Sequence, residues 1–127
     1  MQFRVITILF FFHSLLFSEE IMKVDLITTN DLHGSISEQM AYFMNPQFPP
    51  KIIGGSGFYN YLNKNIDREK SLIVDAGNFF QGHPISDIDS GKTVIEYMNK
   101  IGYTAIVPGV DDFIYGSENL NALADIS

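Results

Sequence analysis

Three apolar runs rich in β-branched residues constrain the fold of this chain more than any other feature. They are residues 24–29 (VDLITT), 72–75 (LIVD) and 103–108 (YTAIVP), and each reads as a buried strand. A helical pattern follows each run. This order, β-α-β-α-β-α, is typical of an α/β protein whose parallel strands are joined by right-handed crossovers.

The helices are predicted from apolar residues at helical spacing. One stripe runs through residues 58–66, and a second runs through residues 94–101, where Gly102 is a plausible stop. Ser117 is expected to cap a third helix that continues to Ala124. Residues 30–55 form a long loop between the first strand and the first helix, and a loop of that length is usually functional or mobile.

The N-terminal residues have the pattern of an export signal. Arg4 precedes the apolar stretch 5–17, which is too short to span a bilayer comfortably, and Ser18 is a small residue where cleavage could occur. We predict a cleaved signal over residues 1–18 and a periplasmic or secreted protein with no stable membrane span after cleavage. The alternative is an uncleaved N-terminal anchor.

Composition excludes several classes of function. The chain has no cysteine, so a disulfide or a thiolate metal site is impossible. Eight basic residues stand against 15 acidic ones, a net charge of −7, which argues against binding nucleic acid through a basic face. The length fits about one domain.

Each predicted strand leads into a polar loop: residues 29–34 (TNDLHG), 75–82 (DAGNFFQG) and 108–116 (PGVDDFIYG). Loops at the carboxyl ends of parallel strands meet at one edge of the sheet, where such folds place their chemistry. In an extended segment, Asp31 and His33 point to the same side and could ligate one zinc, manganese, iron or cobalt ion. The alternative is a turn aspartate and a surface histidine.

Two further features have two interpretations each. The glycines of residues 54–57 (GGSG) could cradle a phosphate at a helix N-terminus, but a tight turn leading into the helix is favoured. His83 could approach the site, although a solvated loop histidine is the simpler interpretation.

Asp75 is expected to order its loop by hydrogen bonds.

Together the three loops resemble the metallophosphoesterase (calcineurin-like) domain of the 5′-nucleotidase and 2′,3′-cyclic-nucleotide phosphodiesterase family, over residues 23–127. The resemblance implies a double β-sandwich flanked by helices, of which this chain would be the β-α-β-α-β-α portion, truncated before the later histidine motifs. It also implies hydrolysis of a nucleotide or another phosphoester by two divalent metal ions.

The resemblance also assigns roles to individual positions. Asp31 and His33 match the family's D-x-H metal ligands, and Asn78 stands where an aspartate bridges the two metals. Val110 replaces an asparagine ligand, and Asp111 stands at the position of the catalytic histidine. The metal ligands carried over are therefore Asp31, His33 and Asn78, and no catalytic residue is assigned.

These departures weaken the expected site. The neutral amide of Asn78 cannot balance two dications, Val110 has no ligand atom, and an ionised Asp111 would repel a phosphate. Asp112 keeps an acid where the family has glutamate. We therefore expect at most one intact metal site and a hydrolase that is impaired or inactive as this chain alone. The alternatives are a non-catalytic exported binding or scaffold relative, or the fragment of an interrupted gene.

Overall fold

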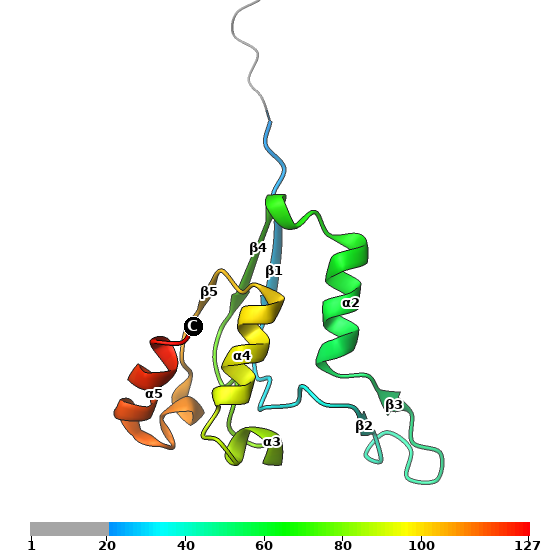
Figure 1. Cartoon of the computed structure of the whole chain (residues 1–127). Coiled ribbons are helices and arrows are strands. Elements are labelled where there is room, and N and C mark those ends of the chain that lie inside the picture. Colours follow the sequence, from blue (N-terminus) through cyan, green and yellow to red (C-terminus); the bar gives the residue numbers. More distant parts are fainter. Residues whose placement is uncertain (1–20) are drawn as a thin grey trace, which may run out of the picture.

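The computed structural model describes residues 21–127, so the predicted signal over residues 1–18 lies outside the described part. Its centre is a three-stranded parallel sheet of β1 (Asp25–Thr29), β4 (Ser71–Asp75) and β5 (Ala105–Ile106), in the order β1-β4-β5 (Figure 1). β1 and β4 pair along their whole length, whereas β5 joins β4 at two positions only. The structure thus confirms three parallel strands and shows that the third is shorter than predicted.

Three main helices follow the strands as expected. They are α2 (Gly55–Asn65), α4 (Lys92–Ile101) and α5 (Gly116–Ala124), with a short α3 (Pro84–Asp87) and the 3-10 turns η1 (Arg68–Lys70) and η2 (Val110–Phe113) between them. Gly102 ends α4 at φ 83°, as predicted. The prediction that Ser117 caps α5 is wrong, because Tyr115 is the capping residue and Gly116, at φ 85°, begins the helix.

The long loop between β1 and α2 contains structure that the sequence did not predict. β2 (Gln39–Met40) and β3 (Lys51–Ile52) form an antiparallel pair, with Gln39 opposite Ile52. Figure 1 shows this hairpin to one side of the three-stranded sheet, below the N-terminal end of α2. Residues 30–55 are therefore a folded excursion and not one continuous loop.

The core lies between the sheet and the helices that cover one of its faces (Figure 1). Two apolar clusters fill it, one around Phe79, Phe80 and α4, the other around Leu62, Ile73 and Ile101. Because strand side chains alternate between faces, the register partners Leu26 and Leu72 project from the opposite face, where they are 66% and 45% exposed. Among residues 21–127, no helix is long and apolar enough to cross a membrane.

Candidate functional site

The loops after β1 and β4 stay hydrogen-bonded to each other beyond the ends of the strands. The N–H of Asp31 donates to the carbonyl of Gly77 over 2.9 Å, that of His33 donates to Asn78 over 3.0 Å, and that of Gly34 donates to Phe79 over 2.8 Å. The backbone therefore brings Asp31, His33 and Asn78 to one place at the carboxyl edge of the sheet. The order of strands and loops in the sequence predicts this meeting.

The backbone conformation that brings Asp31 and His33 together differs from the predicted one. The segment is not extended, since φ is +52° at Asp31 and +46° at His33, and Asn78 also has a positive φ of +56°. Residues other than glycine adopt this left-handed backbone conformation only at a cost in energy. Three such residues at one site make its backbone unusual. The result still places the His33 Nε2 atom 3.8 Å from Asp31 Oδ1.

His33 is oriented by its second ring nitrogen. Nδ1 lies 2.9 Å from the carbonyl oxygen of Gln81, so this nitrogen carries the proton and donates it. The other ring nitrogen, Nε2, is the one that faces Asp31. A backbone carbonyl on one nitrogen and a carboxylate beside the other is the arrangement that fixes a metal-ligating histidine.

Two amide groups hold the carboxylate of Asp31. Asn78 Nδ2 donates to Oδ1 over 2.8 Å, and Asn30 Nδ2 donates to Oδ2 over 2.7 Å. The Asn78 hydrogen bond is the main reason that the pKa of Asp31 lies below its ordinary value, with Asn30 contributing next. Asp31 is therefore ionised at neutral pH and remains exposed to solvent.

The Asn78 side chain joins two loops. Its Nδ2 group donates to Asp31, while its Oδ1 atom accepts the backbone N–H of Asp111 over 3.1 Å. Asp111 thus contacts the cluster through its main chain, and Val110 beside it is 81% exposed. Gly109 makes the close approach possible, because a Cβ atom there would collide with Asn78 Oδ1 and lie 2.7 Å from Asn78 N.

Asp112 is a buried carboxylate whose role sequence reasoning missed. Its oxygens accept four backbone N–H groups: Asn78 over 2.7 Å, Gly109 over 2.8 Å, Phe79 over 2.9 Å and Phe80 over 3.4 Å. The only local signal was an acidic residue three positions after Gly109, as at the third position of a capping box. Asp112 fastens the loop after β4 to the loop after β5.

Asp75 has the loop-ordering role predicted for it. Its buried carboxylate accepts the Thr29 hydroxyl over 2.5 Å and the Gly77 N–H over 2.8 Å. Burial is the main reason that its pKa is raised. The Thr29 hydroxyl also lies 2.9 Å from the hydroxyl of Tyr103, a residue between α4 and β5, so β1, β4 and the segment before β5 meet beneath the site.

The two features with open interpretations are now placed. His83 is not a free loop residue, because its Nδ1 atom accepts the Ile85 N–H over 3.3 Å and caps α3, while its Nε2 atom lies 3.4 Å from the Ser37 hydroxyl. Gly54 and Gly55 form the tight turn into α2, where the Gly55 N–H donates to the carbonyl of Ile36 over 2.9 Å. That amide is already paired within the protein, which favours the turn over a phosphate cradle.

The donor set fits a metal ion only in part. Within residues 21–127, no group of three or more histidine, cysteine or acidic residues could hold one. Asp31 and His33 provide one carboxylate and one imidazole that face each other, which suits a single ion. Asn78 turns its NH₂ group, and not its oxygen, toward Asp31, so in this orientation it is not a ligand.

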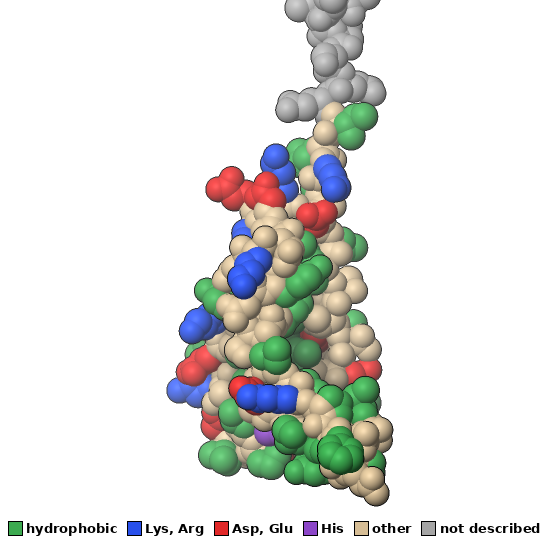
Figure 2. Space-filling view, turned by 90° about the vertical axis from the view of Figure 1, so that its right-hand side faces the viewer, with side chains coloured by type: hydrophobic (Ala, Val, Ile, Leu, Met, Phe, Trp, Pro, Cys, Tyr) green, Lys and Arg blue, Asp and Glu red, His purple; other side chains and the backbone are tan. Residues whose placement is uncertain are grey.

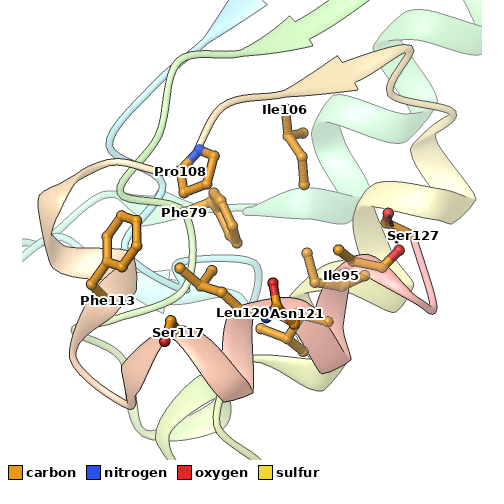
Figure 3. A pocket seen from close by; sticks show the side chains of 11 residues that line it. Phe79, Ile95, Ile106, Pro108, Phe113, Ser117, Leu120, Asn121 and Ser127 are labelled. Carbon is orange, nitrogen blue, oxygen red and sulfur yellow. Dashed lines mark hydrogen bonds between the residues drawn. The ribbon is translucent and has the colours of Figure 1, made fainter.

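An apolar pocket of about 330 Å³ is lined by side chains that include Phe79, the residue after Asn78 in the chain (Figure 3). Phe79 contributes to its wall together with side chains of β5, α4 and α5 such as Ile106, Ile95 and Leu120. Ser117 and Asn121 supply polar atoms to the lining. Asp31, His33 and Asn78 do not line the pocket, so it is an apolar cavity without a candidate metal ligand.

Comparison with known proteins gives a likeness in structure. No family model matches the chain, and no curated protein matches it either. Among solved structures, a 5′-nucleotidase precursor from Thermus thermophilus superposes with a TM-score of 0.63 at 20% identity, over 80% of this chain and 20% of that one. This chain thus spans about a fifth of the length of that protein. The likeness supports the mixed α/β fold with a parallel sheet flanked by helices.

Proposed function

We propose that residues 23–127 are part of a metallophosphoesterase domain of the 5′-nucleotidase type, with at most one divalent metal site. Asp31 and His33 would hold the ion, which would be of the manganese, zinc, cobalt or iron kind. The ion would supply a positive charge to bind and polarise a phosphoester such as a nucleotide. We expect this chain alone to be weak or inactive as a hydrolase.

One observation carries this proposal. The Asn78 amide is hydrogen-bonded on both sides, to the Asp31 carboxylate and to the Asp111 backbone, while His33 Nε2 still faces Asp31. Asn78 could turn its oxygen toward a metal only by giving up both of its bonds. The arrangement therefore favours a two-ligand site for one ion, and a bridge between two ions has no carboxylate to form it.

A second function has an observation of its own. The cluster of Asp31, Asn78 and Asp112 meets its hydrogen-bonding needs from within the chain. Such a cluster can serve as a structural junction, which fits a non-catalytic binding or scaffold protein. Export of either form rests on the sequence of residues 1–18 alone.

Metal affinity of the purified chain tests the proposal, and Asn78→Asp is the informative variant. A carboxylate at that position would face the Asp31 carboxylate, and a cation between the two relieves their repulsion. We expect calorimetric titration with Mn²⁺ to show weak binding by the wild type that His33→Ala abolishes. We expect Asn78→Asp to bind at least about tenfold more tightly.

Asn30→Asp is the matched control, because Asn30 donates to the other oxygen of the same carboxylate. It adds the same charge beside Asp31, and we expect little gain in affinity. Equal gains in the two variants would mean that charge alone attracts the ion. Absence of binding by wild type and Asn78→Asp alike, from folded samples, would favour the non-catalytic function. Metal-dependent phosphodiester turnover by the wild type, lost in His33→Ala, would contradict the expected inactivity.

A further inference from the structure

Several large apolar side chains are exposed together on the β2–β3 hairpin, outside the cluster of Asp31, His33 and Asn78. We name residues 39–50 (QMAYFMNPQFPP) the apolar loop, and it contains no charged residue. Phe43 is 81% exposed, Phe48 79%, Met44 65% and Tyr42 62%. Figure 2 looks onto this side of the molecule and shows hydrophobic side chains gathered at its lower end. A patch of this kind on a folded domain marks an interaction site.

Six backbone N–H groups of the apolar loop donate to acceptors inside the loop. Asn45 Oδ1 accepts the N–H groups of Gln47 and Phe48 over 3.1 and 3.0 Å, and the Ala41 N–H donates to the carbonyl of Pro50 over 2.8 Å. Other N–H groups that donate inside the loop are those of Tyr42, Met44 and Asn45. Prolines at positions 46, 49 and 50 have no N–H to satisfy. The loop can therefore enter an apolar medium without stranding these donors.

Charge is confined to the base of the hairpin. Glu38 and Lys51, the charged residues that flank the apolar loop, form an ion pair with each other. The hairpin thus has a polar base and an uncharged tip. A tip that enters a bilayer needs this division, because charged groups stay at the level of the headgroups.

We propose that the apolar loop inserts into the interfacial region of a lipid bilayer that has electrically neutral headgroups. Three successive residues, 42–44, and Phe48 are exposed together on a loop that carries no charge, between a pair of charged residues that can stay among the headgroups. Tyr42 can place its ring among the lipid chains and its hydroxyl among the headgroups.

The charge of the molecule selects the lipid. The net charge of −7 disfavours approach to an anionic surface, so zwitterionic phosphatidylcholine is the lipid that fits. The apolar stretch 5–17, predicted to be an export signal, would independently bring the chain to a membrane. The experiment must therefore separate insertion of the apolar loop from attachment through the N-terminus.

A single tryptophan makes that separation, because the chain contains none. Phe43→Trp reports on the tip of the apolar loop, and Tyr61→Trp, at a position of α2 that is 58% exposed, is the matched control. Each full-length variant is mixed with phosphatidylcholine vesicles whose acyl chains carry bromine. We expect emission of the Phe43→Trp protein to shift to shorter wavelength and to fall about twofold, because the loop enters the acyl-chain boundary. We expect emission of the Tyr61→Trp protein to stay unchanged.

Three results would overturn the proposal. The first is unquenched Phe43→Trp emission from protein that floats with the vesicles, which would mean attachment through residues 5–17 alone. The second is a concentration-dependent blue shift without lipid, which would show that a second copy of the chain covers the loop. The third is stronger quenching by vesicles that contain anionic phosphatidylglycerol, which would contradict the assignment of a neutral surface.

Discussion

Asn78 is held by two aspartates that contact different parts of it. Asp112 is fully buried and accepts the backbone N–H of Asn78, whereas Asp31 is exposed and accepts from its side-chain amide. The buried carboxylate fixes where the loop runs, and the exposed one stays accessible to a cation. Residue type alone does not separate these roles, since both are aspartates beside the same asparagine.

The role of Asp112 can be tested by the change of one atom. In Asp112→Asn, an NH₂ group replaces an oxygen that faces backbone N–H donors, so at least one donor is left without an acceptor. We expect the unfolding free energy in urea to fall by about 2–4 kcal/mol, because bonds to a charged acceptor are lost and a buried donor is stranded. Asp111→Asn, at the neighbouring position, should change it by less than about 0.5 kcal/mol. Similar losses in both variants would refute the role of Asp112 in holding the loop after β4 to the loop after β5.

At the scale of elements, the strands and helices could be predicted because each has its own local pattern. β4 is a continuous apolar run rich in β-branched residues and α4 is apolar at the period of a helix, so their limits lie within about two residues of those expected. β5 is shorter than predicted because it pairs with β4 at only two positions. The β2–β3 hairpin has two-residue strands in a proline-rich segment, which leaves no period to detect.

The sequence predicted where the candidate site lies in the fold but not the geometry of its side chains. Strand order puts the three polar loops at one edge, and Asp31, His33 and Asn78 do meet there. The positive φ values of these residues and the direction of the Asn78 amide depend on contacts between distant loops. No periodicity or spacing encodes such contacts, so the hydrogen bonds by which Asp112 joins the two loops could not be predicted.

The junction between the loops after β4 and β5 depends on the absence of a side chain at Gly109. Its φ of −86° is ordinary, so Gly109→Ala tests collision with Asn78 and not backbone strain. We expect a loss of about 1–3 kcal/mol in thermal or urea unfolding. The loss should shrink when Asn78→Ala removes the colliding oxygen, and a double-mutant cycle measures that coupling.

Gly116→Ala is the control for this experiment. Gly116 has φ +85°, but a Cβ atom added there would meet nothing within 4 Å, so a methyl group causes backbone strain without collision. We expect a loss of about 1–2 kcal/mol that Asn78→Ala leaves unchanged. If Asn78→Ala rescued both glycine variants equally, the collision at Gly109 would not be the cause.

For the whole molecule, the two faces of the sheet differ in what covers them. Helices pack on the face of Ile73, while Leu72, the preceding residue of the same strand, is 45% exposed. Parallel sheets are generally covered on both faces. In residues 21–127 the face of Leu26 and Leu72 has no such cover, which leaves apolar surface in water.

Equal truncations on the two faces test this asymmetry. Ile73→Ala should lower the unfolding free energy by about 2–5 kcal/mol, because it opens a cavity in the core. Leu72→Ala should lower it by less than about 1 kcal/mol, because a half-exposed side chain leaves no cavity. Urea denaturation at low protein concentration provides both values. Equal costs would show that the face of Leu72 is covered in the folded protein.

The hydrogen-bonded amide of Asn78 also has a genetic consequence. Codons for asparagine and aspartate differ at their first base alone, so one point mutation would replace the bridging amide by a carboxylate opposite Asp31. Position 111 is likewise one base from a histidine codon, whereas valine at position 110 is two bases from asparagine. A single mutation could therefore convert the hydrogen bond between Asn78 and Asp31 into a pair of facing carboxylates that needs a cation between them. The backbone around both residues would already be in place.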